Sequence, residues 1–352
     1  MFNLISNIFG SKRYIVLLIL AVVICFIAGQ NYFGWLLSIF TTYAIMANNC
    51  AQTIGMFIAT NKNKSKERAI YFLVPVFIIT ILISWLFYDR QLDFFLLDRI
   101  TYSDDLSLLL IFLPILLFLL TKYKIPVSAT FLIIPIFANK STIQSMISKT
   151  SVSYFVSFVI SLIIWRTIYI KYKHWIEVKN EGEVGKIWFI LQFVSTGIVW
   201  AVWIVLSTCN FVVFLPRVFS LKELLLFVSV GVVSICLILF DNGGEIQEIV
   251  DEKSDINIKS SVVFNFLFAF VMLFIQYVSK IPITSTWMFL GILAGREFAI
   301  TVSRDGIFGS SYYRKCFVKV WSDLRSAIFG IVVSLAFVEM IGLVSGGLVK
   351  SY

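Results

Sequence analysis

Apolar residues occur along this chain in long runs that are separated by short polar stretches. The hydrocarbon core of a bilayer is about 30 Å thick, so a helix that crosses it needs about 20 mostly apolar residues. Runs of this kind occupy residues Tyr14–Ala28, Phe33–Thr60, Ala69–Phe87, Leu106–Leu120, Val152–Ile170, Ile187–Leu206, Leu224–Phe240, Val262–Val278 and Ala327–Leu348. The pattern therefore predicts an all-α polytopic membrane protein that crosses the bilayer many times.

Two polar segments interrupt this pattern in the same way. Lys280–Arg296 begins Lys-Ile-Pro-Ile-Thr-Ser-Thr-Trp and places a proline beside three hydroxyls, and Lys124–Thr130 reads Lys-Ile-Pro-Val-Ser-Ala-Thr. Hydrocarbon cannot satisfy such groups, so they are tolerated where protein or a water-filled cavity surrounds them. We predict two re-entrant hairpins, near 124–140 and 280–297, in an internally duplicated transporter fold with inverted repeats at 1–175 and 176–352.

Composition and charge agree with a membrane location. Of 352 residues, 59% are hydrophobic and 14% are charged, whereas about a quarter are charged in soluble domains. The net charge of +9 comes from basic residues at the ends of apolar runs, such as Lys12, Arg13 and the cluster from Lys62 to Arg68. These residues indicate a partner that is a lipid bilayer and not a nucleic acid. The positive-inside tendency places them in the cytoplasm and Asp89–Asp105 outside.

The side chains needed for several kinds of chemistry are missing. The sequence has five cysteines without paired spacing and one histidine, His174, which lies in a charged stretch. A metal cluster of His and Cys and a serine-histidine-acid triad are therefore excluded. The sequence also lacks a GxxxxGK[ST] loop for ATP. We expect a protein that is not an enzyme and has no cofactor, and that is driven by a gradient of sodium ions or protons.

Each half also carries an amide-bearing polar cluster upstream of its proline segment. The first is Ala47–Gly55, which contains Asn48, Asn49, Gln52 and Thr53. We expect it to face the bundle interior, either as a partly unwound helix that holds an anion or as a plain helix that bonds to its neighbours. The second is Phe240–Glu248, which is either a counterpart of the first or an ordinary loop that leaves the membrane.

These four segments resemble the motifs of the inorganic phosphate transporter (PiT) family, which comprises ion-coupled phosphate symporters and also sulfate permeases. Ala47–Gln52 (ANNCAQ) and Asp241–Glu245 are similar to its two GANDVAN-type motifs. Pro126–Phe131 (PVSATF) and Pro282–Trp287 (PITSTW) are similar to its two PVSTTH-type hairpins. Gly291 and Gly295 follow the second hairpin, whereas Pro135 and Asn139 stand where the first would have glycines.

The resemblance implies a substrate site built from the four motifs. Its expected members, with a nearby arginine added on its charge, are Asn48, Asn49, Gln52, Thr53, Ser128, Thr130, Asp241, Asn242, Gly243, Thr284, Ser285, Thr286 and Arg296. Asn49 and Asn242 replace the acidic residues that the family uses near its coupling cation, and neutral amides are weaker ligands for a hard cation. A sodium site at Asn49, Asn242 and Glu245 and a proton carrier both remain open.

The expected function is transport of an inorganic oxyanion, phosphate first and sulfate second, by alternating access. We expect a multi-pass protein of the bacterial inner membrane, with a homodimer as a candidate assembly. Arg296 either faces the anion or forms a structural ion pair with Glu297. One rival is a sensor or complex subunit that keeps the fold without transport. Another is a glycan polymerase or flippase, which the lack of a large external loop with arginines disfavours.

Overall fold

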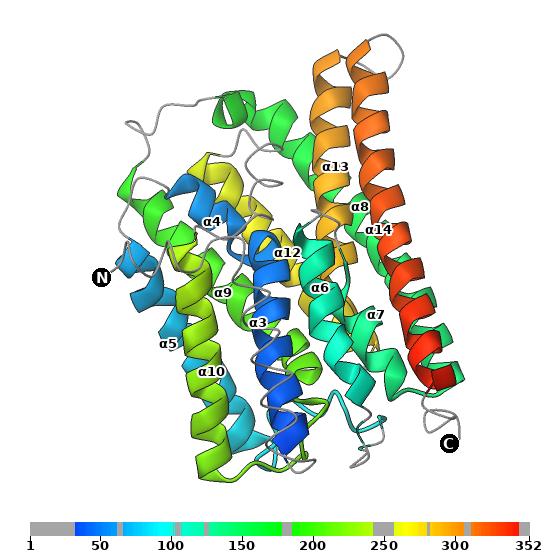
Figure 1. Ribbon diagram of the computed structural model, residues 1–352. Coiled ribbons are helices and arrows are strands. Elements are labelled where there is room, and N and C mark those ends of the chain that lie inside the picture. Colours follow the sequence, from blue (N-terminus) through cyan, green and yellow to red (C-terminus); the bar gives the residue numbers. More distant parts are fainter. Residues whose placement is uncertain are drawn as a thin grey trace.

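The computed structural model describes residues 32–61, 66–100, 102, 106, 108–122, 127–177, 185–241, 257–279, 282–305 and 311–344. In these ranges the chain is helical and contains no strand (Figure 1). The elements are α3 (Phe33–Thr53), α4 (Gly55–Thr60), α5 (Lys66–Phe87), η2 (Leu108–Ile111), α6 (Phe112–Lys122), α7 (Ala129–Ile133), η3 (Ile134–Ile136), α8 (Lys140–Glu177), α9 (Lys186–Val212), α10 (Leu221–Phe240), α12 (Ile258–Ser279), α13 (Ser285–Asp305) and α14 (Ser311–Val344).

Six helices of the described part are long and apolar enough to cross a membrane. They lie in α5, α8, α9, α10, α12 and α14, and Leu108–Thr121 forms a shorter apolar helix. These positions confirm a polytopic membrane protein and agree with the apolar runs predicted from Ala69 onward. The first predicted run, Tyr14–Ala28, lies outside the described residues.

The run predicted at Phe33–Thr60 forms two helices that are separated by Ile54. Ile54 has φ −110° and ψ −1°, away from regular helical values. The backbone N–H of Ile54 still donates to Cys50 O at 2.9 Å, and Ile58 N–H donates to Ile54 O at 2.9 Å. The helix is therefore interrupted at one residue without losing these two backbone hydrogen bonds, and ligand binding there would depend mainly on side chains.

Lys124–Thr130 and Lys280–Arg296, each with a proline followed by hydroxyls, are called here the proline-hydroxyl segments. The chain folds differently after each of them. After the first, α7 and η3 make a short helical stretch, and Asn139 then begins α8 by accepting a hydrogen bond from Thr142 N at 2.9 Å. After the second, α13 is one helix of 21 residues, so it continues past residue 297. The re-entrant hairpins and the inverted repeat remain predictions.

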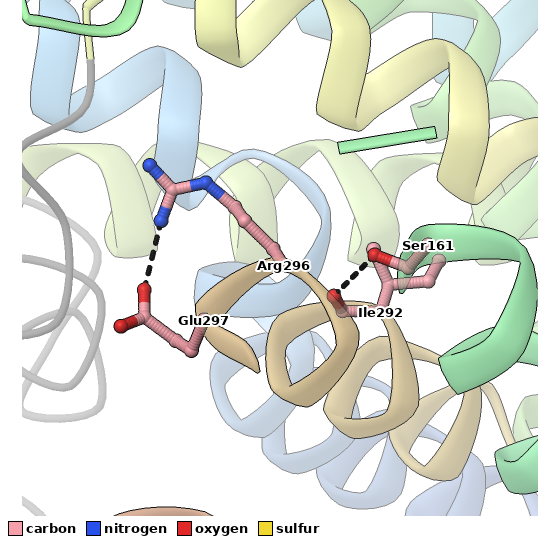
Figure 2. A network of polar contacts seen from close by, with 4 residues as sticks. All are labelled: Ser161, Ile292, Arg296 and Glu297. Carbon is pink, nitrogen blue, oxygen red and sulfur yellow. Dashed lines mark hydrogen bonds and ion pairs between the residues drawn. The ribbon is translucent and has the colours of Figure 1, made fainter. Parts of the chain in front are cut away.

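Helix α13 packs closely on α8. A Cβ atom at Gly291 would overlap the backbone oxygen of Tyr154, and one at Gly295 would overlap that of Phe158. The Ser161 hydroxyl of α8 donates to Ile292 O of α13 at 2.7 Å (Figure 2). The two glycines therefore let the helix backbones approach, as small residues do between membrane helices. Since α8 begins in the first predicted half and α13 lies in the second, the halves are in direct contact.

The connections gather at two ends of the bundle. At one end, the Lys66 ammonium group of α5 donates to Phe240 O of α10 at 2.8 Å. At the other end, Phe219 N–H, just before α10, donates to Arg90 O, just after α5, at 3.0 Å. Helices α5 and α10 therefore run antiparallel (Figure 1). The positive-inside tendency predicts that the Lys66 end is cytoplasmic and the Arg90 end is outside.

Candidate functional site

The polar turn at the end of α3 faces the bundle interior, which confirms that prediction. Asn48, Asn49, Gln52 and Thr53 are all buried, with exposed fractions of 6% or less. Buried amides and hydroxyls must find hydrogen-bond partners, because an unpaired polar group in an apolar interior is costly. The hydrogen-bond partners of these side chains therefore show which segments pack against this turn.

Asn48 connects α3 to the first proline-hydroxyl segment. Its Nδ2 atom donates to Val127 O at 2.9 Å, and its Oδ1 atom lies 3.0 Å from the Thr121 hydroxyl of α6. Val127 precedes Ser128, whose side chain accepts from Phe131 N at 3.3 Å and caps α7. Asn48 thus holds the start of α7 against the middle of the bundle.

Gln52, one turn further along α3, connects the same helix to the second segment. Its Nε2 atom donates to Thr286 Oγ1 at 3.2 Å. The Thr284 hydroxyl in turn accepts from Thr286 N at 3.2 Å at the start of α13. Ser285 is buried beside them. One helix therefore contacts both proline-hydroxyl segments through adjacent turns, so these parts of the predicted site do lie near a common element.

In each of the two segments, a threonine accepts a hydrogen bond from a buried amide, and the sequence did not reveal this common feature. Thr130 and Thr286 occupy the same place in the two motifs, four residues after Pro126 and Pro282. Thr130 Oγ1 accepts from Asn210 Nδ2 of α9 at 3.2 Å, as Thr286 Oγ1 accepts from Gln52. The amide oxygens of Asn210 and Gln52 are buried and accept no hydrogen bond from any residue that the structure describes. The sequence signal for Asn210 was an amide at the end of an apolar run.

The second amide cluster is only partly described. Asp241 is exposed at the C-terminal end of α10, where its N–H caps Leu237 O. It therefore differs from Asn48, Asn49, Gln52 and Thr53 of α3, which are buried. Asn242, Gly243 and Glu245 lie outside the described residues. Of the predicted sodium ligands only Asn49 is described, and within the described ranges no group of His, Cys, Asp and Glu could hold a metal ion.

Arg296 lies on α13 away from the hydroxyl groups. It is ten residues after Thr286, which corresponds to about 15 Å along a helix. Its Nη1 atom lies 2.9 Å from Glu297 Oε1 (Figure 2). Its guanidinium carbon lies 5.0 Å from the centre of the Trp165 ring. A buried guanidinium with a carboxylate and an aromatic partner is a stable arrangement. This geometry favours the ion-pair interpretation over anion binding.

A further polar cluster, not predicted from the sequence, lies toward the Lys66 end. Gln192 Nε2 of α9 donates to Thr60 Oγ1 of α4, and Asn61 Nδ2 donates to Gln192 Oε1 at 3.3 Å. Asn265 Nδ2 of α12 donates to Thr196 Oγ1 at 3.0 Å. Neutral polar groups therefore continue beyond the break in α3 along α4, α9 and α12.

Comparison of this chain with protein-family models, with curated proteins and with solved structures found no match. The case for a function therefore depends on the arrangement of side chains and on the motif resemblance. In the part of the chain that the structure describes, the contacts around α3 offer neutral hydroxyl and amide groups in an otherwise apolar interior. Such groups can hold a small polar solute by hydrogen bonds.

Proposed function

We propose that this chain is an ion-coupled secondary transporter that moves an inorganic oxyanion, phosphate first and sulfate second, by alternating access. The observation that carries the proposal is the position of α3. Asn48 and Gln52 on adjacent turns each bond to a different proline-hydroxyl segment, at 2.9 Å and 3.2 Å. These are the segments that resemble the substrate-binding hairpins of the PiT family.

The chemistry of the side chains supports an anion. An oxyanion that leaves water needs several donors, and the hydroxyls of Ser128, Thr130, Thr284, Ser285 and Thr286 are all buried. Hydrogen bonds to a charged group are worth about 1.5–3 kcal/mol each. None of these donors carries a full charge, so the anion would be held without a strong salt bridge, which favours release on the other side of the membrane.

The interruption of α3 at Ile54 supports alternating access. Discontinuous helices near the middle of the membrane are where secondary transporters place substrate and moving parts. Here the break separates the Asn48–Thr53 turn from α4, whose far end is held to α9 by the side-chain bonds of Gln192. Reorientation of α4 about Ile54 would open the polar turn toward the Lys66 end.

A second candidate function is a sensor or complex subunit that kept the fold without transport. It is favoured by the fact that both polar atoms of the Asn48 amide are engaged within the protein. Amides at helix contacts in membranes often act as structural bonds. In that case the polar turn would stabilise packing and would not exchange its bonds with a substrate.

The test is uptake of labelled phosphate into proteoliposomes, with sodium and proton gradients imposed separately and unlabelled sulfate as a competitor. The variant Ser128→Ala/Thr286→Ala removes one hydroxyl from each segment. The control Thr80→Ala/Ser229→Ala removes hydroxyls that donate to Val76 O and Leu225 O within their own helices. We expect the first variant to weaken the apparent affinity for phosphate about 10- to 100-fold, because hydrogen bonds to the anion are lost.

The control should transport as the unmodified protein does. Equal losses in both variants would mean that the hydroxyls matter for folding and not for substrate. If well-folded protein neither transports nor binds phosphate or sulfate, the transporter proposal is wrong and the subunit interpretation takes its place.

A further inference from the structure

A buried carboxyl group lies in the connection after α5, at the end of the bundle predicted to be outside. Asp93 has an exposed fraction of 1%, and its neighbours Leu92 and Leu97 are buried with it. This connection is not part of the motifs that resemble the PiT family. Carboxyl groups are rarely buried without a charged partner, so Asp93 needs a specific explanation.

The hydrogen bonds of Asp93 are incomplete for an ionised carboxylate. Its Oδ2 atom accepts from Leu97 N at 2.8 Å. Its Oδ1 atom is buried and has no hydrogen-bond partner among the described residues. An ionised carboxylate has about four acceptor positions, and an unpaired buried charge is penalised strongly. A proton on Oδ1 would remove the charge and leave the bond from Leu97 intact.

The groups that interact electrostatically with Asp93 do not form an ion pair with it. They are Arg217, between α9 and α10, Asp98, in the same connection, and Cys209, on α9. Arg217 donates to Ile100 O at 3.1 Å. Burial raises the pKa of Asp93 above its ordinary value, while the Leu97 N–H and the Arg217 charge act in the opposite direction and offset part of the rise. A carboxyl held in this balance can change its protonation state without breaking a salt bridge.

The backbone around Asp93 is held in an unusual conformation. Asp89, Arg90, Phe94 and Phe95 have φ values of 49°, 61°, 54° and 59°. Non-glycine residues in this region cost about 1–2 kcal/mol each, and such strain persists where the surroundings fix the chain, often at functional sites. Here the buried side chain of Leu92 and the bond from Phe219 N to Arg90 O fix it.

Asp93 is also connected to the candidate substrate site through α9. Cys209 lies near enough to Asp93 for the Asp93 charge to act on its thiol, and the next residue, Asn210, donates to Thr130 Oγ1. Two neighbouring residues of one helix thus face the carboxyl and the first proline-hydroxyl segment. A change in the charge of Asp93 would therefore change the electrostatic potential near Asn210, at the outer side of the candidate substrate site.

We propose that Asp93 is the proton-binding group of this transporter, which takes up a proton at Oδ1 from the outer solution together with the oxyanion and releases it in the inward-facing state. This inference rests on the proposed function, and it assigns the coupling ion as a proton. The step is a simple equilibrium in which carboxylate and proton give the neutral acid. Protonation leaves Asp93 neutral, so its carboxyl group does not repel the oxyanion that binds at the candidate substrate site.

The experiment uses proteoliposomes that contain a pH-sensitive dye, with inorganic phosphate added outside. Asp93→Asn is compared with Asp93→Glu and with the matched control Asp98→Asn, since Asp98 is exposed in the same connection. We expect Asp93→Asn to lose phosphate-induced proton influx and proton-driven accumulation by at least about tenfold, the change expected for an effect of 1.4 kcal/mol. Phosphate-for-phosphate exchange, which needs no net proton movement, should remain.

Asp93→Glu should restore proton influx with a shifted pH profile. Asp98→Asn should keep proton influx, with its pH profile displaced toward lower pH, because the Asp98 charge that raises the pKa of Asp93 is removed. Unchanged proton influx in Asp93→Asn would overturn the proposal, and so would loss of exchange together with accumulation, because that shows a structural role. Uptake driven by sodium alone would also overturn it.

Failure of the proposed function is recognised separately. If the unmodified protein neither binds nor moves phosphate, the titration of Asp93 is read by infrared difference spectra of its carboxylic acid, with Asp93→Asn as the blank. A protonated band that persists above the ordinary pKa of aspartate would support a proton site. Titration in the ordinary range would contradict it.

Discussion

Among individual residues, the sequence predicted which polar side chains are buried better than it predicted their partners. Asn48, Gln52, Thr130 and Thr286 were expected at the site from their motifs, and all four are buried and bonded to other segments. Asn210 was missed, because its partner Thr130 is 80 positions away in the chain. Local sequence shows that a buried amide needs a partner, but only the fold decides which one.

Asp93 gives a prediction about stability and pH. Its pKa is raised in the folded protein by burial, so the folded state binds the proton more tightly than the unfolded state does. The resulting stabilisation is full below the unfolded pKa, declines as the pH rises toward the folded pKa, and is absent above it. Unfolding of the detergent-solubilised protein, followed by tryptophan fluorescence, should therefore show a melting temperature that falls across this window.

The variant Asp93→Asn should remove this contribution and be at least as stable as the unmodified protein at neutral pH, because no buried charge remains. Asp98→Asn should keep it. A pH dependence that is identical in the unmodified protein and in Asp93→Asn would show that another group is responsible.

Among helices, the length of the apolar runs predicted where most helices lie, but the sequence did not show which helices pack against each other. The polar turn was expected to be either partly unwound or a plain helix, and the helix is interrupted directly after it, at Ile54. The length of α13 was not foreseen, because the proline and hydroxyls of 280–297 indicated a short hairpin. Its partner explains the difference. Small residues Ser157 and Ser161 of α8 lie directly against Gly291 and Gly295, so α13 can pack as one continuous helix.

The contact between α13 and α8 should be sensitive to a single methyl group. Gly291→Ala and Gly295→Ala would each place a Cβ atom against backbone of α8, and overpacking of this kind costs about 1–3 kcal/mol. Gly342→Ala is the matched control, because no atom of another described segment lies within 4 Å of its added Cβ. Alanine there should leave stability unchanged or raise it slightly, since alanine favours helices.

Unfolding of the three variants in detergent would measure these effects. The proposed role of the glycines would be wrong if Gly291→Ala and Gly295→Ala were as stable as Gly342→Ala. If the glycine variants fold but transport more slowly at unchanged affinity, the α8–α13 contact would also take part in the movement between states.

For the whole molecule, the orientation of the protein in the membrane decides from which side Asp93 would take up its proton. The run of apolar segments predicted a polytopic protein because each crossing contributes its own burial in lipid, nearly independently of the others. The positive-inside tendency adds an orientation, with the Lys66 end cytoplasmic and the connection that carries Asp93 outside. The proton would then be taken up from the side where Asp98, five residues further on, is exposed.

This orientation can be tested with single cysteines at exposed positions in a background that lacks the native cysteines. Lys186→Cys lies at the start of α9, and Asp98→Cys lies in the connection after α5. A membrane-impermeant maleimide added to intact cells should label Asp98→Cys and should reach Lys186→Cys only after the membrane is opened. The opposite pattern would invert the protein and place Asp93 at the cytoplasmic end, which would contradict the proposed uptake of a proton from the outer solution. Labelling of both positions from one side would show that the number of crossings between them is even, which would contradict α8 as the single candidate span in the described residues between Asp98 and Lys186.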